Sequence, residues 1–549
     1  MGLLTWIVFL PTVFALAVLA LPRGNDRAVR VVAFVGMLID FAATLVLVQR
    51  FLPASGMQLV ERVPWVEAFG IEYHLGVDGI SLWLLVLTGF IGPIAVLGSW
   101  NGIRERVREF HFLLLLLQTG MMGVFASLDL FLFYVFWELT LIPMYFLVGV
   151  WGHERRLYAA YKFFVYTMAG SLLMLVAIIS LVLEHQRQTG VYTFDLLQLY
   201  ATQIPPGHEM WYFAAFALAF AIKVPMWPLH TWLPDAHVEA PTAGSVILAA
   251  ILLKMGSYGF LRFAIPLFPN ALQQAMPLLL ALAVIGIVYG ALVSMVQPDL
   301  KKLVAYSSVS HLGFVMLGLF AFNRQGIEGA IYQMLNHGVS TGALFFLVGM
   351  LYERRHTRAI AQFGGLSRSM PIYATVFVIV SLSSIGLPGL NGFVGEFLIL
   401  LGAFKEARLH AILGATGVVF AAVYLLWAVQ RVLFGKIDRE ENRTLPDLGR
   451  RELAVLVPLL ILIVVMGVFP KPFFERMHVS VGDLMAHVDD RVQTDRRVQS
   501  VDAAGPLATT TAPAAALDPP VAVLDAPPAP GLAAEPPATP GTGSGEVWR

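Results

Sequence analysis

Four ionisable side chains lie within stretches of the sequence that are otherwise apolar. They are Glu138 in FLFYVFWELTLIPMYF, Lys223 in FALAFAIKVPMWPLH, Lys254 in VILAAILLKMGSYGF and Glu396 in GLNGFVGEFLIL. A charge at the centre of a membrane helix costs roughly 2.5 to 3.5 kcal/mol unless it pairs with another charge or meets water. Because intramembrane charges mark ion and proton pathways, we interpret these residues as groups that take up and release protons.

Glu138 and Lys223 have opposite charges, and we expect them to act as a pair. Burial disfavours the charged form of a lysine, whereas a carboxylate about 4 Å away favours it by up to about 4 kcal/mol at an effective dielectric constant of about 20. Moving the carboxylate would therefore switch the lysine between holding and releasing its proton. The alternative is that the pair only locks helices together, which leaves Lys254 and Glu396 unexplained.

Three histidines in apolar segments are candidate proton relays between these charges: His311 in SSVSHLGF, His337 in QMLNHGVS, and His230 near the end of the seventh span. Imidazole changes its charge near neutral pH, although a buried histidine also serves simply to hydrogen bond a neighbouring helix. Three acidic residues near the ends of spans are expected to be solvated or to cap helices: Asp78, Glu109 and Asp299. The spacing of potential ligands predicts no metal site.

The composition is that of a helical membrane protein. The chain of 549 residues is 58% hydrophobic and 13% charged, with a mean hydropathy of +0.74. Continuous apolar runs such as ELAVLVPLLILIVVMGVF cross a hydrocarbon core about 30 Å thick as helices, whereas the strands of a barrel alternate in polarity. A large soluble core is the alternative, but it does not require so many long apolar runs.

The composition and the motifs of the sequence argue against several classes of function. The chain has no cysteine, so it offers no disulfide, no thiolate iron–sulfur ligand and no cysteine zinc site, and we expect no redox centre in it. The glycines of GLPGLNGFVGE lie within an apolar segment, and no nucleotide-binding loop is present. The 36 basic and 36 acidic side chains cancel, so nucleic acid is not an expected partner.

Hydropathy predicts about fourteen spans. We expect them near residues 3–20, 31–51, 79–99, 111–128, 130–151, 163–184, 211–230, 243–263, 273–296, 303–321, 327–351, 371–404, 411–430 and 453–470. Loops after odd-numbered spans hold roughly three times as many Lys and Arg residues as loops on the other side, which predicts that both termini lie on the periplasmic side. The first span has no basic segment before it, and we expect it to remain uncleaved.

Two spans contain helix-breaking residues. Pro225 and Pro228 follow Lys223, and Pro388 lies among the glycines of IGLPGLNGFVG. Broken helices in corresponding positions of two halves are typical of transporters built from inverted repeats. We therefore expect an all-α polytopic fold with two inverted five-helix repeats, each containing one broken helix. The expected divisions are three N-terminal helices, the first repeat, the second repeat, a fourteenth helix and a disordered Ala/Pro-rich tail, at residues 1–110, 111–263, 273–431, 453–470 and 500–549.

Four motifs resemble the antiporter-like subunits of respiratory complex I and their Mrp antiporter relatives. They are FAIKVPMWPLHTWLPDAHVEAPTAGSVILAAILLKMGSYGFLRF, LGVDGISLW, WELTLIPMYFLVG and KKLVAYSSVSHLGF, and the resemblance spans about residues 70–435. In that family the central proton carrier is a lysine of the seventh helix, partnered by a glutamate of the fifth, and these positions match Lys223 and Glu138. The lysine of the eighth helix matches Lys254 and passes protons toward the twelfth helix.

The resemblance favours the M-type (chain 4 type) subunits of proton-translocating NADH:quinone oxidoreductase. Their ionisable residue on the twelfth helix is usually glutamate, as at Glu396, whereas L-type, N-type and Mrp D-type members have lysine. The L-type pattern of a histidine followed four residues later by lysine is also absent, because Thr341 follows His337. Unlike in the L-type, we expect no long lateral helix after the last span.

An M-type identity implies L-type and N-type subunits as partners in a bacterial inner membrane or an equivalent energy-transducing membrane. NADH, FMN, iron–sulfur clusters and quinone would be bound by other subunits, so this chain would belong to an oxidoreductase without performing its redox chemistry. The alternatives are a subunit of an Mrp-type cation/proton antiporter or membrane-bound hydrogenase, and a passive scaffold of the membrane arm.

Overall fold

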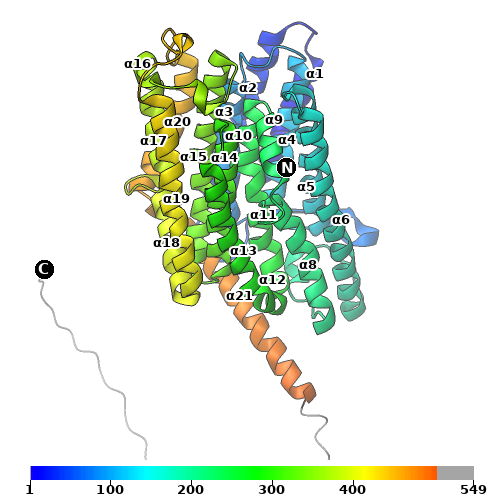
Figure 1. The fold of residues 1–549 in the computed structure, drawn as a ribbon. Coiled ribbons are helices and arrows are strands. Elements are labelled where there is room, and N and C mark those ends of the chain that lie inside the picture. The colour runs from blue at the N-terminus through cyan, green and yellow to red at the C-terminus, as the bar shows by residue number, and fades with distance from the viewer. Residues whose placement is uncertain (1, 504–549) are drawn as a thin grey trace, which may run out of the picture. The chain divides into compact units, whose positions relative to one another are not determined.

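The structure, a computed structural model, describes residues 2–503, and most of them lie in helices (Figure 1). The expected disordered tail at 500–549 falls outside the described residues from 504 onward. Twelve helical segments are long and apolar enough to cross a membrane. They are α1 (Leu3–Ala20), α2 (Asp26–Arg50), α3 (Gly79–Gly98), α4 (Val107–Ala126), α5 (Leu130–Trp151), α6 (Arg156–Thr189), the segment Thr242–Leu267, α13 (Pro269–Met295), α14 (Leu300–Phe320), α15 (Arg324–Arg355), α19 (Arg408–Leu433) and α20 (Arg450–Val468).

The two spans expected to be broken are interrupted in the structure. The first is α8 (Pro206–Lys223), which ends at Lys223 before the chain continues as α9 (Trp232–Glu239). At this break the indole of Trp232 donates to the carbonyl of Ile222 (2.9 Å), which satisfies a backbone group that a continuous helix would have paired. The second is α17 (Pro371–Ile385), which ends at Gly386 with φ +84° and is followed by α18 (Asn391–Glu406). The count of fourteen spans and the inverted repeats stay predictions.

The segment Thr242–Leu267 contains a third irregularity, which the sequence analysis did not predict. It starts as α10 (Thr242–Ile247), widens into a π-helical turn, η2 (Leu248–Leu252), returns to α-helix in α11 (Leu253–Gly259) and widens again in η3 (Phe260–Ala264) before α12 (Ile265–Leu267). A π-helical turn holds an extra residue and is found frequently at functional sites. The most apolar windows of this segment and of α15 are 100% buried, so both are central helices.

The chain forms a β-hairpin between α2 and α3, which was not predicted from the sequence. Its strands are β1 (Gln58–Val66) and β2 (Ile71–Val77), joined by the short helix η1 (Glu67–Phe69). The carboxylate of Glu61 on β1 accepts hydrogen bonds from Gly2 N (2.9 Å) and Leu4 N (2.7 Å), at the start of α1. Backbone donors at a helix start have no partner within the helix, so the hairpin caps α1.

The helices continue after α20 with α21 (Lys471–Ala503), which was not predicted from the sequence. The absence of a long lateral helix of the L-type stays a prediction. Met477, Val481 and Val488 are buried, at the spacing of one helical face. The carboxylate of Asp483 accepts from the Ser55 hydroxyl (2.6 Å) and from Gly56 N (3.1 Å) near the hairpin. The remaining short helices are α7 (Leu196–Leu199), η4 (Ile360–Gln362), α16 (Leu366–Ser369) and η5 (Glu440–Asn442).

Candidate functional site

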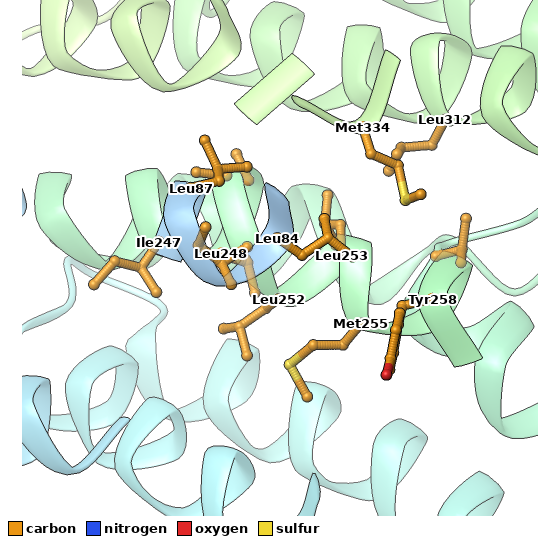
Figure 2. Packing of buried hydrophobic residues seen from close by; sticks show 14 of the residues in the cluster. Leu84, Leu87, Ile247, Leu248, Leu252, Leu253, Met255, Tyr258, Leu312 and Met334 are labelled. Carbon is orange, nitrogen blue, oxygen red and sulfur yellow. The ribbon is translucent and has the colours of Figure 1, made fainter. Parts of the chain in front are cut away.

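Lys254 is fully buried in the centre of the molecule, on the first turn of α11. Its neighbours along the helix, Leu252, Leu253 and Met255, pack among apolar side chains that include Leu312 and Met334 (Figure 2). Its Nζ atom donates to the carbonyl of Ala249 (2.5 Å), which belongs to the wide turn η2. The wide turn therefore provides a backbone acceptor for a fully buried ammonium group.

The same Nζ atom lies 2.5 Å from Nδ1 of His337, on α15. The His337 ring lies 6.1 Å from the ring of His311 on α14, centroid to centroid. A small cavity adjoins both imidazoles, and polar side chains dominate its lining: His311, Gln333, Asn336, His337, Ser340, Thr341, Ser383 and Ser384. Such a lining supplies the polar partners that a water molecule needs.

Glu396 lies on α18, just after the second helix break, and contacts two of the residues that line this cavity. Its Oε1 atom accepts hydrogen bonds from Nδ1 of His311 (2.9 Å) and from Nε2 of Gln333 (2.9 Å). On the other side of the His311 ring, Nε2 lies 3.3 Å from the hydroxyl of Tyr424 on α19. Lys254, His337, His311 and Glu396 thus form a row of side chains, with hydrogen-bond contacts at both ends and a ring–ring contact of 6.1 Å between the two histidines.

Lys223 and Glu138 form a second, separate group. Lys223 is 1% exposed, and its Nζ atom lies 5.1 Å from the ring centroid of Trp137 and 5.8 Å from that of Phe163. Glu138 is only half-buried and interacts with the hydroxyl of Ser171 and, at longer range, with the lysine. Among the described residues no ion pair within 4.0 Å joins the two charges, so the pair expected from the sequence is not closed in this structure.

The third candidate relay, His230, is not part of the row. It is buried, and its nearest ring contacts are Tyr289 (5.0 Å between centroids) and Tyr306 (6.4 Å). The acidic residues near span ends behave as expected: Asp78 and Asp299 cap α3 and α14 and bind Arg262 and Arg358, whereas Glu109 is exposed.

Two ionisable side chains beside the row were missed from the sequence. His237 on α9 is fully buried, its ring is stacked on Phe345 (4.5 Å between centroids), and it interacts electrostatically with Lys254. Lys301 on α14 is 5% exposed, and its Nζ atom donates to the carbonyl of Ala240 (2.6 Å). Hydropathy placed Lys301 in a charged loop, and His237 lay in a motif that was used only for the resemblance.

Comparison with known proteins shows the family of the chain. Residues 127–423 match the model of the family described as NADH:quinone oxidoreductase/Mrp antiporter, TM. The chain belongs to this family. The matched region contains all four charged residues and all three histidines expected from the sequence.

Two relatives of this antiporter family member are 45% and 44% identical to it. NADH-quinone oxidoreductase subunit M of Rhodobacter capsulatus is 45% identical over 497 residues, which cover 88% of the chain and 96% of that protein. NADH-ubiquinone oxidoreductase chain 4 of Marchantia polymorpha is 44% identical over 486 residues, covering 88% and 97%.

Solved structures agree with the family assignment. A chain of respiratory complex I from Thermus thermophilus with bound NADH has a TM-score of 0.81 and 35% identity, covering 88% of this antiporter family member and 99% of that chain. A chain of the Mrp complex from Dietzia sp. DQ12-45-1b has a TM-score of 0.77 and 19% identity, covering 89% and 100%, and shares the fold.

Proposed function

We propose that the chain is the proton-translocating M-type subunit of an NADH:quinone oxidoreductase. The observation that carries the proposal is the buried row of proton-exchanging groups in which Lys254, His337, His311 and Glu396 follow one another. The names of the relatives, NADH-quinone oxidoreductase subunit M and NADH-ubiquinone oxidoreductase chain 4, support the assignment to this complex.

The row suggests a sequence of proton transfers in which each proton is held at a definite atom. Lys254 gives a proton from Nζ to Nδ1 of His337, which lies within hydrogen-bond distance. The polar cavity then connects His337 with His311. Nδ1 of His311 lies 2.9 Å from Oε1 of Glu396, so the two side chains are positioned for a proton transfer between them. Glu396 finally carries the proton toward the opposite side of the membrane.

Lys223 and Glu138 regulate proton transfer along this pathway. When the carboxylate of Glu138 lies farther away, it no longer stabilises the buried ammonium group of Lys223. The lysine then releases its proton toward the row. When Glu138 approaches, the lysine holds a proton again, because an opposite charge nearby favours the charged form. The open arrangement of the pair corresponds to the releasing state of this switch.

The redox chemistry belongs to other subunits in this proposal. The chain contains no cysteine, and NADH, FMN, iron–sulfur clusters and quinone would be bound elsewhere in the complex. The L-type and N-type antiporter-like subunits would be its neighbours, in a bacterial inner membrane or an equivalent energy-transducing membrane with both termini on the periplasmic side. Electron transfer in those other subunits would then drive the movement of Glu138 relative to Lys223.

The runner-up is a subunit of an Mrp-type cation/proton antiporter or a membrane-bound hydrogenase. Identity to the Mrp chain is 19%, against 35% to the complex I chain and 45% to a subunit M. Glu396 also has the residue type expected of the M-type. Both observations favour the oxidoreductase.

The test measures quinone reduction and proton pumping in membranes whose complex carries Lys223→Ala or Glu138→Ala. We expect the complex to assemble and both rates to fall by at least about tenfold for Lys223→Ala, because a positioned proton-transfer group contributes that much or more. Lys302→Ala, which alters an exposed lysine, is the control and should leave both rates unchanged. If the assembled Lys223 and Glu138 variants pump normally, the chain is a passive scaffold and the proposal is wrong.

A further inference from the structure

A cluster of potential metal ligands includes two residues of the β-hairpin and lies outside the spans that carry the intramembrane charges. Glu72 and His74 are two residues apart on β2 and therefore point to the same face of the hairpin. Asp195, at the start of α7, faces them from a different part of the chain. One potential ligand atom from each residue lies within 4.8 Å of those from the other two.

His74 provides the observation that separates this cluster from an ordinary group of acidic residues. Its side chain is 3% exposed, and Nδ1 makes no hydrogen bond in the described structure. That nitrogen lies 3.7 Å from Oδ2 of Asp195. A buried polar atom without a partner is unfavourable, and it is rare in folded proteins unless a water or an ion binds it. His74 is therefore an unused ligand directed at a carboxylate.

Arg62 on β1 now neutralises the two carboxylates. Its Nε atom contacts Oε2 of Glu72 (2.5 Å), and Nη2 contacts Oδ2 of Asp195 (3.0 Å). The Arg62 side chain is 44% exposed, so it can turn outward into solvent while the other three residues remain in place. Asp129 lies behind the cluster, where its Oδ2 accepts from the backbone N–H of Glu72 (3.0 Å) and holds β2 in position.

We propose that Glu72, His74 and Asp195 bind a divalent transition-metal ion of the Zn²⁺ type, which replaces the guanidinium of Arg62. Imidazole nitrogens and carboxylate oxygens are both zinc ligands, with bonds of about 2.0 to 2.2 Å, and a site with three protein ligands keeps a fourth position for water. The imidazole selects against Mg²⁺ and Ca²⁺, which prefer oxygen ligands alone. The half-buried Glu72 side chain can move its carboxylate oxygen to within bonding distance of the ion.

A bound ion would fasten the hairpin to the rest of the molecule. It would join β2 to the start of α7 and, through Asp129, reinforce the attachment of the hairpin to the start of α5, the helix that carries Glu138. This inference does not depend on the proposed proton pathway, because none of its residues belongs to the row or to the Lys223 group.

Titration of the purified full-length chain in detergent with Zn²⁺, in competition with a chromophoric chelator, tests the proposal. We expect one equivalent to bind, and affinity to fall by at least about tenfold in Glu72→Gln and in His74→Gln, since loss of a ligand costs no less than loss of a second-shell partner. Arg62→Gln should instead tighten binding, because it removes the competing cation. Glu67→Gln and His208→Gln alter exposed residues and are the matched controls.

The increase in affinity on removing Arg62 is a result that a purely structural ion-pair cluster would not give. The proposal is overturned if the wild-type chain binds no Zn²⁺, or if Glu72→Gln and Arg62→Gln bind it as the wild type does. Both of these residues are partly exposed, so their variants keep the test decisive even if His74→Gln fails to fold.

Discussion

Nζ of Lys254 lies 2.5 Å from Nδ1 of His337, in a position where neither side chain reaches solvent. Two nitrogens at this distance share a proton, so at least one of them must be unprotonated. The contact thus joins the titration of a lysine on α11 to that of a histidine on α15. We expect that coupling to be essential for transfer between the helices.

Replacing His337 should interrupt the row with little effect on assembly. In His337→Gln the polar contact to Lys254 is retained, but the side chain no longer binds and releases a proton near neutral pH. We expect proton pumping by membrane vesicles to fall by at least about tenfold. His208→Gln changes an exposed histidine on α8 and should pump normally. Unchanged pumping by an assembled His337→Gln complex would show that protons bypass His337.

Glu396→Gln tests the other end of the row. The amide keeps the size of the side chain and an oxygen that accepts from Gln333 and His311, so packing should survive. Proton transfer through the carboxylate is lost, and we expect pumping and coupled quinone reduction to decrease together. Glu406→Gln, at the exposed end of the same helix, is the matched control. Equal pumping rates in the two variants would remove Glu396 from the pathway.

His153 should make stability depend on pH. It lies in the loop between α5 and α6, where burial and then the positive charges of Lys301 and Arg358 lower its pKa to about 4. Between pH 6.5 and 4, His153 is protonated in the unfolded chain but not in the folded chain. The free energy of unfolding therefore decreases as the pH falls from 6.5 to 4. Because the ring is partly exposed, the loss is less than about 1.4 kcal/mol per pH unit.

The measurement for His153 compares melting temperatures at neutral and mildly acidic pH. His153→Phe keeps an aromatic ring for the contact with Tyr352, whose ring centroid lies 5.0 Å away. We expect the variant to lose less stability than the wild type on acidification. Parallel losses in both proteins would mean that other groups dominate acid unfolding.

The buried ion pair between Arg262 and Asp78 should be important for stability. The contact is 2.5 Å long, and both side chains are 6% exposed. In Arg262→Met the carboxylate is left buried without its partner, which costs about 3 to 5 kcal/mol. Arg187→Met breaks the exposed contact with Glu184 and should cost about 1 kcal/mol or less. Denaturant titrations of both variants in detergent check the difference, and similar midpoints would contradict the prediction.

Most of the fold could be predicted from the sequence because hydropathy and proline act locally. The long apolar runs became helices, and the two expected breaks occur beside Pro225 and Pro388. The hairpin and α21 could not be predicted in this way. Their stability comes from contacts with distant segments, such as Glu61 with the start of α1 and Asp483 with Ser55 and Gly56.

The residue types of the candidate site could be predicted, but their order in space could not. An isolated charge in an apolar span is visible in the sequence, so Lys254 and Glu396 were found. Which histidine meets which charge depends on how the helices are rotated about their axes, and that rotation is set by packing. The contact between Lys254 and His337 also depends on the wide turn η2, for which no proline or other local signal exists.

The extra residue in η2 allows one part of a transmembrane helix to rotate about the helix axis relative to the other part. Each residue of an α-helix advances about 100° around the axis. If η2 tightened into a regular α-helical turn, the residues on one side of it would therefore swivel by about that angle relative to the other side. Lys254 is the second residue after η2, so such a one-residue slip would swing its ammonium group away from either Ala249 or His337. A helix that is 100% buried in its most apolar window thus contains a point of rotation beside Lys254.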